Sequence, residues 1–121
     1  MRYVHNMRFI GREVRRLESG EEVEFGVLEY SDFRGRRCRV LVTRVWFENS
    51  LIYLEFFSCN KRLLVKAMKY FGEFFGAFFF MKKKLVQYSG GYMYAFYNTQ
   101  VVLERALEVF EGDRVRLLNC G

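Results

Sequence analysis

The segment KKKLVQYSGGYMYAFY, residues 82–97, carries residue types that bind nucleic acid. Lysine ammonium groups attract phosphate oxygens, and tyrosine rings exposed on a sheet can stack on bases, at about 1–3 kcal/mol per base. The alternative is that the rings pack between a β-hairpin and a helix, since tyrosine is a common strand residue. Strand alternation predicts that Tyr92 and Tyr94 share one face and Tyr97 the other. The residues assigned to this surface are Lys82, Lys83, Lys84, Tyr88, Tyr92 and Tyr94.

A second basic cluster surrounds a predicted turn at Gly35. A planar guanidinium group can donate paired hydrogen bonds to a phosphate, so arginines at this turn could hold a nucleic-acid backbone. The alternative is a solvated loop in which the arginines pair with Glu24 or Glu29. The nucleic-acid interpretation is strengthened if this cluster and the lysines lie on one side of the protein. The arginines of the cluster are Arg34, Arg36, Arg37 and Arg39.

Signals for catalysis are weak. The single histidine, His5, has no Ser, Cys or Asp at a spacing typical of a nucleophilic site, and the chain has no phosphate-binding glycine loop. Glu48 and Glu55 could suggest a metal-dependent nuclease, but the strand register predicted below gives Glu55 a partner in Arg44. We therefore predict a non-enzymatic protein with no catalytic residue, no metal ligand and no cofactor.

The three cysteines, Cys38, Cys59 and Cys120, are far apart in the sequence and form no Cys-x-x-Cys pair. A zinc site is therefore not expected. An odd cysteine count also argues against the disulfide framework of a secreted protein. Because the N-terminal residues lack the apolar core of a signal peptide, the cytoplasm is the expected location.

A chain of this length, 121 residues, is expected to form one domain over residues 1–121. Its net charge of +6 favours anionic partners such as nucleic acid, although a modest positive charge can also serve solubility alone. The high content of Arg and Glu, with only two Gln, is typical of thermophile composition.

The longest apolar run, from Asn60 to Met81, predicts a central helix that begins at an Asn60 cap and ends near Phe75 or Gly76. Its most apolar part, residues 70–81, is shorter than the roughly 18 residues that a membrane span needs, and it contains Glu73. We therefore expect a buried helix and no membrane partner. The residues that share its apolar face are Leu64, Ala67, Met68, Phe71 and Phe75.

Residues 22–30, 36–47 and 51–58 alternate as three strands of an antiparallel meander, while residues 12–18 fit either a short helix or a strand, with the strand favoured. A turn at Asn49–Ser50 would place Arg44 opposite both Glu22 and Glu55. The sheet face that the central helix is expected to cover then consists of Val23, Phe25, Leu41, Thr43, Val45, Phe47, Ile52, Leu54 and Phe56.

The rest of the chain predicts a hairpin of residues 78–88 and 92–98, a Thr99-capped helix over residues 100–111 that Gly112 stops, and an edge strand at residues 114–118. The predicted class is therefore α+β: an antiparallel β-meander covered by a central helix, followed by a β-hairpin and a second helix.

An apolar strip is expected on the outer face of the meander, covered either by the second helix or by another copy in a homodimer. Two functions follow from these patterns. The first is a small nucleic-acid-binding protein that acts as a homodimer. The alternative is an oligomerising structural or regulatory module for protein–protein interaction. The strip consists of Val42, Trp46, Tyr53 and Phe57.

Overall fold

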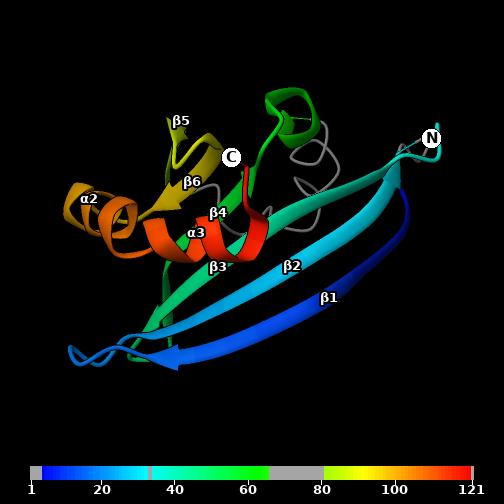
Figure 1. The fold of residues 1–121 in the computed structure, drawn as a ribbon. Helices are drawn as coiled ribbons and strands as arrows, with labels where there is room; N and C mark the ends of the chain where they lie inside the picture. Colours follow the sequence, from blue (N-terminus) through cyan, green and yellow to red (C-terminus); the bar gives the residue numbers. More distant parts are fainter. Residues whose placement is uncertain (1–3, 33, 66–80, 121) are drawn as a thin grey trace.

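The computed structural model describes residues 4–32, 34–65 and 81–120. They form a six-stranded antiparallel sheet with the strand order β1-β2-β3-β4-β6-β5, together with helical segments (Figure 1). The strands are β1 (Val4–Arg16), β2 (Glu22–Asp32), β3 (Arg37–Phe47), β4 (Ser50–Ser58), β5 (Lys82–Tyr88) and β6 (Gly91–Tyr97). Residues 61–65 are helical, and two helices follow β6, namely α2 (Gln100–Val109) and α3 (Glu111–Leu118). The predicted α+β class is confirmed.

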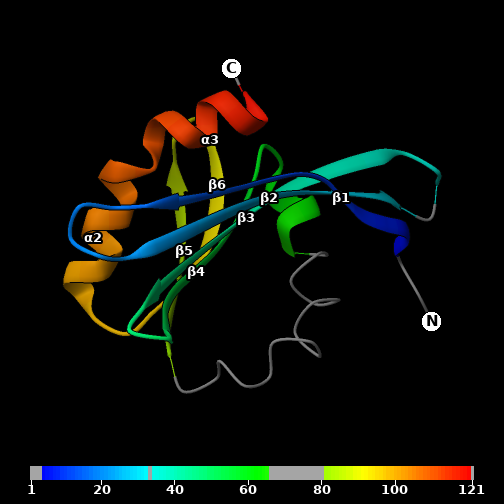
Figure 2. The same cartoon turned by 90° about the horizontal axis from the view of Figure 1, so that it is seen from below.

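The sheet carries apolar side chains on both faces. Helices α2 and α3 lie together on one face (Figure 2), where Leu103, Ala106 and Phe110 pack against the strands. On the other face the buried Leu64 of the helical residues 61–65 packs against the sheet, and Met81 joins the same cluster. The remainder of the predicted central helix, residues 66–80, lies outside the described residues.

The face that the sequence assigned to the central helix is packed against α2 and α3 instead. Val23, Phe25 and Leu41 of that predicted face belong to the same buried cluster as the α2 residue Leu103. The alternation in β2 and β3 was therefore predicted correctly, and the element expected to cover it was wrong. Periodicity reports which residues share a face, but it does not report which helix packs there.

The turn between β3 and β4 differs from the prediction. It is formed by Glu48 and Asn49, which both have positive φ, and it pairs Phe47 with Ser50. Two-residue hairpin loops favour positive φ at both positions because their twist then matches that of the strands. The predicted Asn49–Ser50 turn would have paired Phe47 with Ile52, two residues further along β4. Because side chains alternate with a period of two, this change alone leaves every side chain on its predicted face.

A bulge next to this turn then reverses the faces of β4. Trp46 pairs with Leu51 but Val45 pairs with Tyr53, so one residue of β4 is skipped. A one-residue shift moves all later side chains to the opposite face. Leu54 and Phe56 therefore face the cluster that contains Leu64, against the prediction.

The predicted charge pairing across the meander is also wrong. Arg44 lies opposite Leu54 and not opposite Glu55, and on its other side it lies opposite Glu24 and not Glu22. Its guanidinium group forms an ion pair with Glu24, which also pairs with Arg12. One glutamate thus lies between two arginines, the reverse of the predicted arrangement.

The expected outer strip is not a surface patch. Tyr53 and Phe57 are buried in the cluster under α2 and α3, while Val42 is buried on the opposite face. The fourth residue, Trp46, is half-buried. Of the two covers considered for the strip, the second helix therefore accounts for Tyr53 and Phe57.

Other elements agree with the sequence in part. The ambiguous residues 12–18 contribute a strand, since β1 runs to Arg16, and the β5–β6 hairpin turns at Ser89 and Gly90. Helix α2 is capped as predicted, because the Thr99 hydroxyl accepts a hydrogen bond from the Val102 amide at 3.4 Å. No helix of the described residues is long and apolar enough to cross a membrane.

The predicted edge strand at residues 114–118 is wrong, because this segment belongs to helix α3. The chain breaks helical geometry at Phe110, whose φ is −99°, and Gly112 then lies inside α3 and does not stop a helix. Asp113 and Arg116 are one helical turn apart, so both side chains can face β1. That spacing was present in the sequence and favours helix over strand.

A disulfide joins Cys59, directly after β4, to Cys120, which follows the Asn119 cap of α3. One disulfide therefore forms despite the odd cysteine count, because one cysteine stays free while the other two pair. The free residue, Cys38, is buried, and burial raises the pKa of its thiol. Two cysteines separated by 61 residues carry no local pattern that reveals their pairing.

Gly91 is required where β6 begins, because a Cβ atom there would lie 2.7 Å from the Ser58 carbonyl oxygen and 2.8 Å from the Phe57 ring. Gly91→Ala is therefore expected to lower the free energy of unfolding by about 1–3 kcal/mol. Gly112→Ala is the matched control, since open space surrounds that helical glycine, and it should raise stability by about 0.5–1 kcal/mol. Urea denaturation measures both changes, and equal effects would contradict the assignment.

Candidate nucleic-acid interface

The three predicted lysines lie on β5, the strand at one edge of the sheet. Lys82, Lys83 and Lys84 are all exposed, and no ion pair among the described residues includes them. They pair in register with Tyr97, Phe96 and Ala95 of β6. Because strand side chains alternate, Lys83 lies on the face of Phe96 while its two neighbours lie on the α2 side. The lysines therefore straddle the edge of the sheet.

The predicted tyrosines divide between the two faces. Tyr92 and Tyr94 are half-buried on the face that carries Lys83, and the Tyr94 ring stacks on Phe96 with 5.3 Å between centroids. Tyr97 belongs to the opposite cluster, which confirms the predicted split along β6. Tyr88 also packs on the α2 and α3 side, so it does not share a surface with Tyr92 and Tyr94.

The loop of the arginine cluster is organised by the buried Asp32. Its carboxylate accepts hydrogen bonds from the backbone amides of Arg34 and Arg36, both at 2.9 Å, and from Arg36 Nε at 2.7 Å. Burial alone would raise the pKa of Asp32, but the hydrogen bonds from Arg36 and Arg34 outweigh it and the pKa is lowered. Arg36 is thereby committed to the loop.

Arg39 is committed in the same way. Its Nε donates to the buried Glu29 at 3.2 Å, and Arg8 approaches the same carboxylate at 3.7 Å. The pairing with Glu29 that the sequence offered as an alternative is thus confirmed for this arginine. Arg34 and Arg37 are exposed at this end of the sheet.

The structure does not bring the two basic clusters together. Lys84 of β5 pairs with Ala95 of β6, which pairs with Glu55 of β4, which in turn pairs with Thr43 of β3. Arg37 lies six residues before Thr43 on β3. With about 3.3 Å per residue and about 4.8 Å between neighbouring strands, the clusters are roughly 25 Å apart. The two clusters therefore form separate surfaces and not one basic patch.

Arginine and lysine behave differently across the described part of the chain. Every ion pair there uses an arginine, and several of the carboxylates involved are almost fully buried. The positive charge of these arginines is therefore largely compensated within the fold. The arginines in such pairs are Arg8, Arg12, Arg15, Arg16, Arg36, Arg39, Arg44, Arg105, Arg114 and Arg116.

A fully buried ion pair, missed by the sequence reasoning, joins α3 to the centre of the sheet. Arg114 Nε and Nη2 donate to the Glu55 carboxylate at 2.8 and 2.7 Å, and neither side chain is exposed. The hydroxyl of Tyr53 donates to the same carboxylate at 2.6 Å. Burial, together with the adjacent Glu55 carboxylate, raises the pKa of Tyr53, so this hydroxyl stays protonated.

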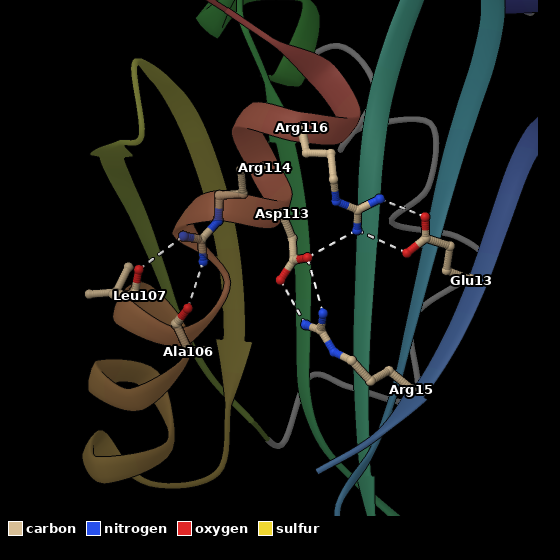
Figure 3. A network of polar contacts seen from close by, with 7 residues as sticks. All are labelled: Glu13, Arg15, Ala106, Leu107, Asp113, Arg114 and Arg116. Atoms are coloured by element: carbon tan, nitrogen blue, oxygen red, sulfur yellow. Dashed lines mark hydrogen bonds and ion pairs between the residues drawn. The ribbon is translucent and has the colours of Figure 1, made fainter.

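The remaining donors of Arg114 cap the end of α2. Its guanidinium group donates to the carbonyl oxygens of Ala106 at 2.9 Å and Leu107 at 3.0 Å, as Figure 3 shows, and to the Ser89 hydroxyl at 3.4 Å. Carbonyls at the end of a helix attract cations, and the Ala106 carbonyl accepts from Arg114 in addition to the Phe110 amide at 3.3 Å. All five N–H groups of this arginine are thus satisfied, and its pKa is raised because the Glu55 contacts outweigh the effect of burial.

A second network fixes α3 to β1. Asp113 accepts from Arg15 at 2.7 and 3.2 Å and from Arg116 at 3.0 Å, and Arg116 also donates to Glu13 at 2.7 and 2.9 Å (Figure 3). Burial would raise the pKa of Asp113, but the two arginines outweigh it and lower the pKa. These residues position the fold and leave no free charge for a ligand.

One sequence signal could have revealed the buried pair. Glu55 is the only charged residue of β4, whose sequence is SLIYLEFFS. A carboxylate inside such an apolar strand requires a cationic partner.

No group of three His, Cys, Asp or Glu side chains that could hold a metal occurs among the described residues. Glu48, the other carboxylate considered for a nuclease site, lies in the exposed turn.

No protein-family model, no curated protein and no solved structure matches this chain.

Proposed function

We propose that this protein binds nucleic acid along the β5 edge of its sheet. Lys82, Lys83 and Lys84 contact phosphates, while Tyr92 and Tyr94 offer ring surface for bases on the face that carries Lys83. The observation that carries the proposal is a contrast in pairing: within the described part of the chain ten arginines form intramolecular ion pairs, and these three exposed, consecutive lysines form none.

The geometry favours a single strand over a duplex. The three lysines span only about 7 Å along β5 and point to both sides of the edge, so they contact two or three successive phosphates. Half-buried tyrosine rings present part of a π-face, which suits stacking on unpaired bases. The arginine cluster, roughly 25 Å away, is not part of this site.

The proposal is tested with the variant Lys82→Gln/Lys83→Gln/Lys84→Gln. For a single strand, each phosphate contact changes log K by about 0.7 per tenfold change in salt concentration. Three contacts therefore raise the association constant about 100-fold at 0.1 M relative to 1 M salt. The variant, which lacks these contacts, should bind about 100-fold more weakly at 0.1 M. Fluorescence anisotropy with labelled 20-nucleotide DNA and RNA, each single- and double-stranded, measures the change.

The matched control is Arg16→Gln/Arg44→Gln/Arg105→Gln, which removes the same number of charges from ion-paired residues away from β5. It should retain affinity within about threefold. Lysines also protect sheet edges from pairing with other chains. If the lysine variant aggregates while nucleic-acid affinity stays unchanged, edge protection is their role and the proposal is wrong.

A further inference from the structure

The second edge of the sheet, formed by β1, has the opposite character to β5. Strand β1 lies at the outer margin of the sheet and pairs with β2 alone among the described residues (Figure 1). It exposes large apolar side chains, with 59% of Phe9, 42% of Ile10 and 57% of Val14 accessible. An exposed edge with apolar side chains is a template for pairing with another strand.

The charges of β1 are already compensated within the chain. Its arginines pair with acids of β2 and α3, as in the contacts of Arg12 with Glu24 and of Arg15 with Asp113. Glu13 of the same strand pairs with Arg116. A second copy of this strand can therefore approach without bringing uncompensated arginines together. For the same reason, the β1 edge offers a polyanion such as nucleic acid little electrostatic attraction.

The bulge in β1 gives the strand a specific pattern. The register of β1 shifts twice, between His5 and Arg8 and between Phe9 and Gly11, and the second shift skips Ile10. Glu13 lies on the α3 face because it bonds Arg116, and the skipped residue places Arg8 on that same face, opposite Glu29. Phe9 and Arg12 share the opposite face. In a regular strand, residues five positions apart, such as Arg8 and Glu13, would lie on opposite faces of the sheet.

We propose that two copies of the protein pair through β1, antiparallel, about a two-fold axis between Ile10 and Gly11. This register places Arg8 of each copy opposite Glu13 of the other, and Phe9 of each copy opposite Arg12 of the other, on matching faces. Opposite charges and cation–aromatic contacts stabilise such cross-strand pairs. A slip by one residue aligns Arg8 with Arg12, whose side chains lie on opposite faces, and so breaks both kinds of contact.

The pairing creates one continuous sheet from the two six-stranded sheets. The two β5 edges then lie at its far ends, roughly 50 Å apart at about 4.8 Å per strand. Both lysine edges remain accessible. The interface is therefore independent of the proposed nucleic-acid site, and either proposal can fail alone.

A charge exchange tests the register. The wild-type chain should sediment with twice its mass of 14.6 kDa at micromolar concentration. Arg8→Glu should raise the dimer dissociation constant about tenfold or more, because two attractive pairs become repulsive. Arg8→Glu/Glu13→Arg restores opposite charges across the axis and should lower the constant again by about threefold or more, with full recovery opposed by the loss of the Glu13–Arg116 bonds. Analytical ultracentrifugation measures all three, and thermal melts verify folding.

A second pair of variants tests the apolar contribution. Phe9→Lys/Val14→Lys should sediment as a monomer, whereas Val101→Lys/Val109→Lys, which alters comparably exposed residues of α2, should remain dimeric. A monomeric wild type, an assembly larger than a dimer, or a dimer that survives Phe9→Lys/Val14→Lys would each overturn the inference. Failure of the double charge exchange to rescue Arg8→Glu would overturn the register.

Discussion

Replacing Arg114 by Met is expected to lower the free energy of unfolding by about 3–5 kcal/mol. The substitution leaves the Glu55 carboxylate buried without its cation, and the Ala106 and Leu107 carbonyls lose a donor. Uncompensated charge in a protein interior is far more costly than the loss of an exposed pair. Guanidinium chloride denaturation followed by circular dichroism measures the change.

Arg116→Met provides the matched control, on the same helix. Arg116 also bonds two carboxylates, but 48% of its side chain is exposed, so solvent screens the pairs and the expected loss is about 1 kcal/mol or less. Adding Glu55→Gln to Arg114→Met removes the unpaired charge and should recover about 1–2 kcal/mol. If the two single variants lose equal stability, or if Glu55→Gln lowers it further, the buried pair does not hold the fold as described.

Removing the Cys59–Cys120 disulfide should lower stability by about 4 kcal/mol. The bond closes a loop between residues 61 positions apart, and loop closure restricts the unfolded chain by about this amount. It also holds the end of α3, the helix that carries Arg114 into the sheet. The variant Cys59→Ser/Cys120→Ser should unfold at the same denaturant concentration as the reduced wild type.

The control for this prediction is reductant itself. Reductant should shift the wild-type midpoint and leave the midpoint of Cys59→Ser/Cys120→Ser unchanged. A wild-type chain whose unfolding ignores reductant would show that the disulfide contributes nothing, and α3 would then be held by its ion pairs and its packing on the sheet.

Local patterns in the sequence predicted the features that depend on neighbouring residues. Alternation located the strands of the meander, the two predicted strands at residues 78–88 and 92–98 located the hairpin, and Thr99 marked the start of α2. Each depends on backbone geometry over a few residues, which the residue types largely determine. The split of tyrosines along β6 followed from the same alternation.

The features that the sequence did not predict depend on contacts between distant residues. One skipped residue near Ile52 reversed the faces of β4, although no residue type there marks a bulge. The partners of Glu55 and of Cys59 lie about 60 residues away, where no local pattern points to them. For the candidate site, the three lysines are exposed. Glu29 pairs with Arg39, as the alternative interpretation of the sequence allowed, whereas the pairing of Asp32 with Arg36 was not predicted.

The dependence of nucleic-acid affinity on salt tests most directly whether the unpaired lysines form the binding edge. For wild-type protein and single-stranded DNA, a plot of log K against log salt concentration should have a slope of about −2, as expected for three phosphate contacts. The slope should approach zero in Lys82→Gln/Lys83→Gln/Lys84→Gln. No binding by the wild type at 50 mM salt, or an equal slope in both proteins, would contradict the account.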